Sequence, residues 1–76
     1  MLKPYYITDM IIDDKFDGEE TVTVDFTLNN DVHSITFKKS DLEILNSWIF
    51  KNGTSLPANL SENILESLRE EVKNKI

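Results

Sequence analysis

A strict alternation of apolar and polar side chains marks residues 21–28 as a strand. The apolar side chains at its even-numbered positions would point to one side of a sheet, and the intervening threonines and aspartate to the other. Residues 5–13 are rich in β-branched and aromatic side chains, which favour a strand, but they do not alternate cleanly, so the register of this first strand stays open. Asp17-Gly18 lies between the two as a turn and predicts an antiparallel pair.

A third strand is expected after a two-residue turn at Asn30-Asp31. That turn would place Phe26 opposite Ile35 and Asp25 opposite Thr36. The other predicted pairs are Leu28 with His33, Val24 with Phe37, and Thr27 with Ser34. The polar face of this sheet, which we expect to be left to solvent or to a partner, carries Thr21, Thr23, Asp25, Thr27, Ser34 and Thr36.

The segment after the third strand predicts a helix. Ser40 and Glu43 have the spacing of a capping box, so a helix is expected from Asp41 to about Asn52, with Gly53 as the residue that ends it. Ser61 signals a second helix, and its apolar stripe is Ile64, Leu65, Leu68, Val72 and Ile76. The predicted fold of residues 1–76 is a single α+β domain, a three-stranded antiparallel meander followed by two helices packed on one face (β-β-β-α-α).

The predicted helix at 41–52 is apolar over more of its circumference than one packing surface needs. Leu42, Leu45 and Ile49 form one stripe, and Ile44 and Trp48 lie beside it. Either this helix is sandwiched between the sheet and the second helix, or Trp48 with Ile44 is an exposed anchor for a partner or a second copy.

Composition excludes several classes of protein. The chain has 76 residues, enough for one domain with a thin core, and no cysteine, which removes disulfides and thiolate chemistry. With only two glycines, a glycine-rich phosphate loop is excluded as well. The chain shows neither a signal-peptide pattern nor an apolar run long enough to span a membrane, so a cytoplasmic protein without a membrane partner is expected.

The net charge of −6 lies entirely in the first part of the chain. Residues 1–31 hold eight acidic and two basic side chains, whereas residues 32–76 hold six of each. This acidity disfavours direct binding to nucleic acid and favours a partner with a basic surface. The candidate partner-binding residues are Asp9, Asp13, Asp14, Asp17, Glu19, Glu20, Asp25 and Asp31, together with Trp48.

Metal and catalytic chemistry have little support in the sequence. The acidic stretch at 13–20 resembles a calcium loop in composition only, because Lys15 and Val24 stand where oxygen ligands are needed. His33, the single histidine, is expected to be a partly buried ring at the sheet edge. We therefore expect no enzyme activity, no metal and no cofactor.

The function expected from these patterns is a non-catalytic acidic protein-binding module. Its abundant Lys, Asn, Ile and Glu are typical of proteins from bacteriophages and mobile elements of AT-rich bacteria. In such a setting the module would be an inhibitor that mimics nucleic-acid charge in the basic cleft of a nucleic-acid-handling enzyme. The alternative is a small structural subunit or homodimer joined through the apolar helix at 41–52, with the acidity serving solubility.

Overall fold

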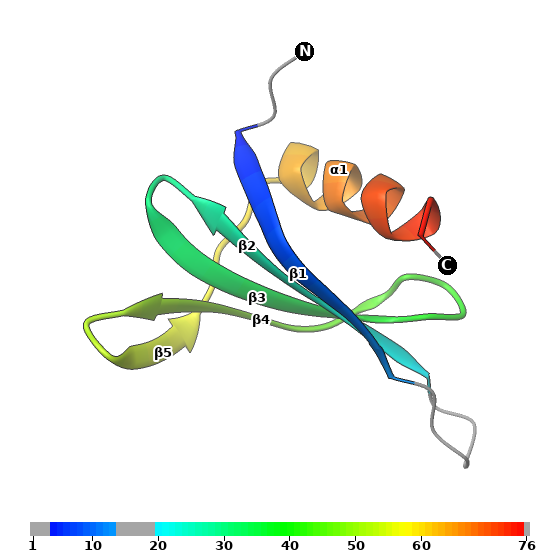
Figure 1. The fold of residues 1–76 in the computed structure, drawn as a ribbon, viewed down its shortest axis with the longest axis horizontal. Coiled ribbons are helices and arrows are strands. Elements are labelled where there is room, and N and C mark those ends of the chain that lie inside the picture. The colour runs from blue at the N-terminus through cyan, green and yellow to red at the C-terminus, as the bar shows by residue number, and fades with distance from the viewer. Residues whose placement is uncertain (1–3, 14–19, 76) are drawn as a thin grey trace.

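A computed structural model describes residues 4–13 and 20–75 of the chain (Figure 1). Within these residues it contains an antiparallel sheet in the order β1-β2-β3-β4-β5, so each strand pairs with its neighbours in the sequence, and one helix. The elements are β1 (Tyr5–Asp13), β2 (Thr21–Leu28), β3 (Asp31–Lys38), β4 (Ile44–Lys51), β5 (Thr54–Pro57) and α1 (Glu62–Lys73). The predicted fold class of three strands and two helices is therefore wrong.

The error lies in the segment 41–52, in which Ile44–Lys51 form the strand β4 and no helix is present. Here the carboxylate of Asp41 accepts a hydrogen bond from the backbone N–H of Glu43 at 3.1 Å, and the N–H of Leu42 donates to the carbonyl of Lys38 at 2.8 Å. A short polar side chain can bond to a nearby backbone N–H in a turn as well as at a helix start, so the apparent capping box is a turn between β3 and β4.

The turn that follows β4 also differs from the prediction. Asn52 and Gly53 have φ angles of 51° and 76°, and they join two strands in which Lys51 lies opposite Thr54. Two residues with positive φ form the tight turn that suits the twist of a β-hairpin, and Asn-Gly is its preferred sequence. Gly53 thus closes a hairpin and does not end a helix.

The first two expected strands are confirmed with the predicted bounds, but the register of the β2–β3 hairpin is wrong by two residues. The turn is formed by Asn29 and Asn30, both with positive φ, so Phe26 lies opposite His33 and not opposite Ile35. Asparagine tolerates positive φ better than most residues, and two in succession form this turn. A shift of two residues keeps every side chain on its predicted face.

A bulge explains why β1 does not alternate cleanly. The register against β2 shifts between Ile7 and Asp9, so Ile7 and Met10 both lie on the buried side of the sheet. The hydroxyl of Thr8, within the shift, donates to the backbone carbonyl of Asp25 at 3.2 Å.

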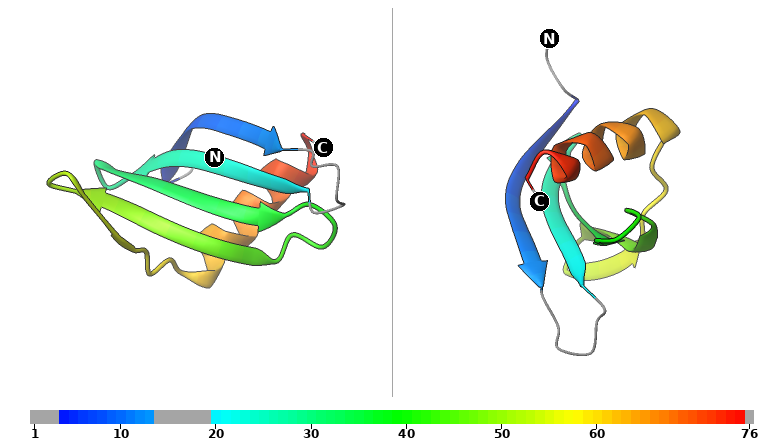
Figure 2. Two further views of the ribbon diagram at one scale, coloured as in Figure 1. Left: turned by 90° about the horizontal axis from the view of Figure 1, so that it is seen from below. Right: turned by 90° about the vertical axis from the view of Figure 1, so that its right-hand side faces the viewer.

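The predicted helix start at Ser61 is confirmed, since its side chain accepts from the N–H of Ile64 at 3.4 Å. α1 packs on one side of the sheet and forms a second layer (Figure 2). The buried apolar residues between the layers are Tyr5, Val22, Val24, Phe26, Leu28, Ile35, Phe37, Leu68 and Val72. The Tyr5 hydroxyl forms a 2.6 Å hydrogen bond with the hydroxyl of Ser67, which ties β1 to α1. One face of the sheet is thereby covered.

Candidate functional site

The face of the sheet turned away from α1, which we call the open face, is covered by no other element in the part of the chain that the structure describes (Figure 2). Its central row runs across four strands. Asp9 lies opposite Asp25, Asp25 opposite Ser34, and Ser34 opposite Trp48. Residues directly opposite each other in an antiparallel sheet point to the same face, so this row places two carboxylates and an indole on one surface.

A second row beside the first is largely apolar. Tyr6 lies opposite Thr27, Thr27 opposite Val32, and Val32 opposite Phe50. The three large apolar side chains of this row are exposed, and so is Trp48, whose exposed fraction is 40%. Contiguous exposed apolar side chains rimmed by polar groups are typical of protein interaction surfaces. The open face therefore combines a hydrophobic area with neighbouring carboxylates.

The electrostatics of the open face are set by Asp9 and Asp25. Neither carboxylate forms an ion pair with any residue that the structure describes, and Asp9 accepts a hydrogen bond from the N–H of Met10 at 3.0 Å. Two like charges directly opposite on one sheet face destabilise the pair. A cation from outside these residues would relieve this repulsion.

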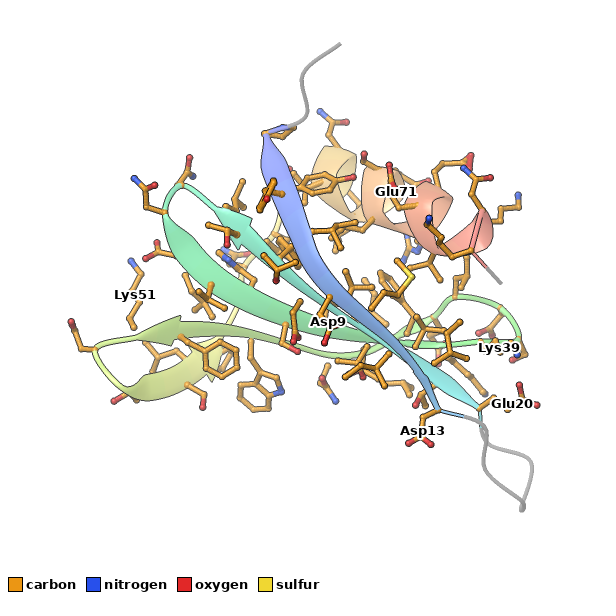
Figure 3. The ribbon with its side chains drawn as sticks, viewed as in Figure 1. Asp9, Asp13, Glu20, Lys39, Lys51 and Glu71 are labelled. Carbon is orange, nitrogen blue, oxygen red and sulfur yellow. The ribbon has the colours of Figure 1, made fainter. Side chains whose placement is uncertain are left out.

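The other acidic candidates do not belong to one surface. Glu20 forms an ion pair with Lys39 at 2.8 Å, and Asp31 forms one with Lys51 at 3.5 Å, so part of the predicted recognition charge is already balanced within the chain. Figure 3 shows these two lysines at opposite ends of the molecule. Asp13 is exposed at the end of β1, near Glu20 (Figure 3). Asp14, Asp17 and Glu19 lie outside the described residues.

The setting predicted for Trp48 was wrong, because no helix forms around it. Trp48 is neither sandwiched in a core nor part of a helical stripe; it lies on β4, opposite Ser34 and Pro57, with its side chain on the open face. The structure places it in the same row as Asp25, a relation that the sequence did not reveal.

His33 is more deeply buried than expected. It lies within β3 with an exposed fraction of 4%, and its ring stacks on Phe26 with centroids 5.0 Å apart and an interplanar angle of 15°. Its Nδ1 lies 2.9 Å from the backbone carbonyl of Asp31. Because a carbonyl oxygen can only accept, Nδ1 carries a proton and donates it in this bond. The ring is thus held between a stacking partner and the backbone.

Metal ligands do not gather in the described part of the chain, where no group of three His, Cys, Asp or Glu side chains is placed to hold an ion. The stretch that resembles a calcium loop in composition falls mostly on residues 14–19, which are outside the described residues.

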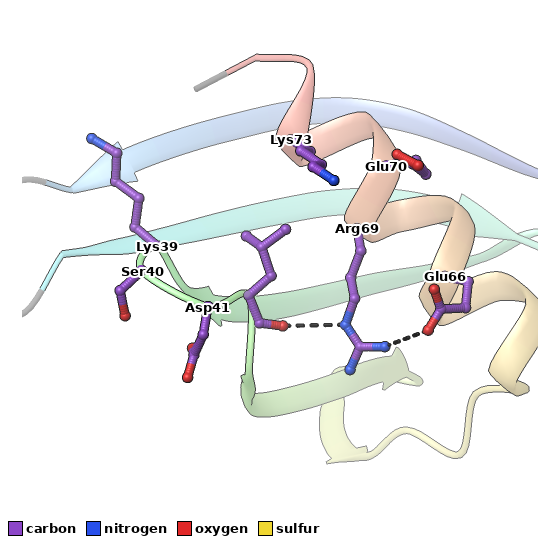
Figure 4. Close-up of a pocket in the computed structure, with 8 residues that line it drawn as sticks. Lys39, Ser40, Asp41, Glu66, Arg69, Glu70 and Lys73 are labelled. Atoms are coloured by element: carbon purple, nitrogen blue, oxygen red, sulfur yellow. Dashed lines mark hydrogen bonds and ion pairs between the residues drawn. The ribbon is translucent and has the colours of Figure 1, made fainter.

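An open hollow of about 440 Å³ lies between α1 and the turn that joins β3 to β4 (Figure 4). Its charged lining is balanced, with three cationic and three carboxylate side chains: Lys39, Arg69, Lys73, Asp41, Glu66 and Glu70. Arg69 is already engaged, since its Nε donates to the carbonyl of Leu42 at 3.2 Å and its Nη1 pairs with Glu66 at 2.9 Å (Figure 4). This hollow holds no excess charge that would select a ligand.

The role of the Arg69 contact is structural. Leu42 has a φ of 58°, a left-handed conformation that costs a residue with a side chain about 1–2 kcal/mol. Its N–H and C=O are held by Lys38 and Arg69 respectively. We infer that the two backbone hydrogen bonds of Leu42 fix the turn before β4 and so the position of that strand.

Sequence reasoning missed four apolar residues of the open face: Tyr6, Ile11, Val32 and Phe50. The available signal was the pair Trp48 and Phe50, two residues apart and aromatic, which favours a strand over a helix. That alternation was obscured because apolar residues are also adjacent in this segment, namely Ile44 with Leu45 and Trp48 with Ile49.

Comparison with known proteins adds no relative. No protein-family model, no curated protein and no solved structure matches the chain. Among the described residues, no helix has the length and apolar character needed to cross a membrane.

Proposed function

We propose that this chain is a non-catalytic binding module that docks a partner protein with a basic surface onto the open face of its sheet. The observation that carries the proposal is the row Asp9, Asp25, Ser34 and Trp48. This row places two carboxylates on the same surface as an exposed tryptophan. Neither carboxylate forms an ion pair with any of the described residues. Tryptophan is enriched at binding hot spots, and carboxylates that complement a basic surface speed association and give specificity.

Solubility alone does not account for this arrangement. A charge that serves solubility can lie anywhere on the surface, whereas Asp9 and Asp25 face each other at a cost to stability. The same face keeps Val32, Trp48 and Phe50 exposed, which lowers solubility. A partner that covers the apolar side chains and supplies a cation would remove both costs.

The partner chemistry that fits best is an arginine set among apolar side chains. A guanidinium can donate two parallel hydrogen bonds to a carboxylate, and it can also stack on the face of an indole. Asp25 and Trp48 lie on either side of Ser34, so one basic segment laid across the sheet would reach both.

Inhibition of a nucleic-acid-handling enzyme is the form of this function that the charge favours. Such an enzyme presents lysine and arginine side chains that otherwise bind phosphates, and carboxylates on the open face would occupy them. A second copy of the chain is the less favourable occupant, because two open faces would bring four aspartates together and each chain carries a net charge of −6.

The test compares three tagged variants as baits in a lysate of the organism that encodes the protein. Trp48→Ala and Asp25→Asn change the open face, whereas Leu56→Ala removes an exposed apolar side chain that lies opposite Ile49 on the other face. We expect the parent and Leu56→Ala to retain the same protein, and the two open-face variants to lose it.

Two further measurements on the recovered complex address the charge. Its affinity should fall as the salt concentration rises, and duplex DNA should compete for the partner. The proposal would be contradicted if all three variants recovered the partner protein equally well. It would also be contradicted if the bait recovered only further copies of itself and the mass of the purified protein in solution rose with its concentration.

A further inference from the structure

The two edges of the sheet differ in how open they are to another strand. β5, at one edge, has four residues and ends in Pro57, whose nitrogen carries no proton. β1, at the other edge, has nine residues and pairs, within the described residues, only with β2. In an antiparallel strand every second residue turns its N–H and C=O away from a given neighbour, so alternate residues of β1 point their backbone N–H and C=O toward its outer edge.

An apolar groove runs beside that edge. It has a volume of about 370 Å³ and is lined by Ile7, Met10 and Ile12 of β1, by Glu71 of α1, and by Lys75, which follows the end of α1. Both views in Figure 2 show this end of α1 close to β1. A groove between an edge strand and a helix is the geometry in which extended peptides add a strand to a sheet.

We propose that β1 binds an extended, basic segment of a partner protein, which pairs with it as a sixth strand and inserts an apolar side chain into this groove. Side chains of such a strand would alternate between the two sides of the sheet. Those on the helix side would lie over Ile7, Met10 and Ile12. Those on the other side would lie beside Asp9 and Asp13, which makes lysine or arginine the complementary residue there.

The charge of β1 favours this occupant over a second copy of the chain. Pairing of two β1 strands would bring Asp9 and Asp13 of both copies to the same edge, and the bulge at Thr8 would interrupt the ladder. At the bulge the N–H of Met10 is already bonded to the Asp9 carboxylate at 3.0 Å. The regular run from Met10 to Asp13 is the part of the edge that a basic strand would use.

The apolar groove of this site lies on the helix side of the sheet, opposite the open face, and the two sites share Asp9 on β1. Ile11 and Ile12 are adjacent on β1 and both exposed, at 53% and 40%, but their side chains point to opposite sides of the sheet. Ile11 belongs to the open face and Ile12 lines the groove. The substitutions Ile11→Asn and Ile12→Asn therefore form a matched pair.

The experiment titrates the ¹⁵N-labelled full chain with a short designed peptide in which lysine alternates with valine, and follows the amide signals by NMR. We expect the largest shifts at residues 10–13, and slower hydrogen exchange there. Two control peptides should not bind: one with glutamate in place of lysine, and one with N-methylated valines, which keep the side chains but cannot donate backbone hydrogen bonds.

The matched variants then locate the site. Ile12→Asn should weaken peptide binding about tenfold or more, because burial of one aliphatic side chain contributes on that scale, whereas Ile11→Asn should bind like the parent. The proposal is overturned if the lysine-valine peptide causes no shifts at β1, if the N-methylated peptide binds equally well, or if Ile11→Asn loses binding and Ile12→Asn keeps it. That last outcome would instead assign the peptide to the open face.

Discussion

The buried ring of His33 shows how one residue can look functional in the sequence and be structural in the fold. It is the only histidine in the chain, yet it stacks on Phe26 and donates to the carbonyl of Asp31. Phe26 in turn meets the ring of Tyr5 edge-on, with centroids 5.9 Å apart. His33 is thus one end of an aromatic series that crosses three strands of the core.

Truncation of His33 should lower stability and leave binding unchanged. We expect His33→Ala to reduce the free energy of unfolding by about 2–4 kcal/mol, as for other large-to-small substitutions in a core. His33→Phe keeps the stacking and loses the hydrogen bond, so its cost should be smaller, about 1 kcal/mol. Urea denaturation measures both values. An alanine variant as stable as the parent would contradict the packing described for this ring.

At the scale of elements, the β4–β5 hairpin depends on the conformation of its turn. Gly53 has a φ of 76°, and a Cβ added there would meet no heavy atom within 4 Å. Any penalty for a side chain at this position therefore comes from the backbone conformation and not from a clash.

Substitutions at Gly53 separate these two effects. Gly53→Ala should destabilise the protein by about 1–2 kcal/mol, the cost of a left-handed conformation for a residue with a Cβ. Gly53→Asn should cost clearly less, because asparagine populates this region more readily. Thermal melts of the two variants beside the parent measure the difference. Equal stability of Gly53→Ala and the parent would show that the turn does not hold this conformation in solution.

The elements that the sequence predicts correctly are those whose local signals all favour the same kind of element. β2 alternates strictly and α1 has both a cap at Ser61 and an apolar stripe, so both are confirmed. The segment 41–52 satisfies two rules at once. The sequence at its start is compatible with a capping box or with a turn, and Asn52-Gly53 is compatible with a helix end or with a hairpin turn. Pairing of β4 with β3 decides between them, and that contact lies beyond local patterns.

The candidate site was predictable only in part, for the same reason. Asp25 and Trp48 were both expected to bind a partner, but on different surfaces, because their common row depends on the registers of two strand pairs. The ion pair of Glu20 with Lys39 joins residues distant in the sequence, so the acidic segment looked freer than it is. Residue types can be read from the chain, whereas their neighbours follow from the register.

At the scale of the whole molecule, α1 covers one face of the five-stranded sheet, and no other element among residues 4–13 and 20–75 covers the opposite face. A small domain of this kind has a small core and a low free energy of unfolding. The free-energy cost of an unfavourable surface feature is therefore a sizeable fraction of that free energy. The facing carboxylates of Asp9 and Asp25 are such a feature. The destabilisation that this pair causes in the isolated chain and its contribution to partner binding can be measured separately.

The isolated chain should become more stable when this pair is neutralised. Asp9→Asn and Asp25→Asn should each raise the free energy of unfolding by a few tenths of a kcal/mol, up to about 1 kcal/mol, because each removes the same repulsion. The double variant should gain little beyond either single one, which a double-mutant cycle detects as coupling. Added salt should stabilise the parent more than the double variant, since it screens a repulsion that only the parent retains.

Glu66→Gln is the matched control, because its carboxylate pairs with Arg69 on the surface of α1 and its neutralisation should not stabilise the chain. If the aspartate variants gain stability and also lose the partner recovered by the parent, the repulsion between Asp9 and Asp25 is the cost of a binding surface; if they lose stability, the two side chains are held by contacts other than those described.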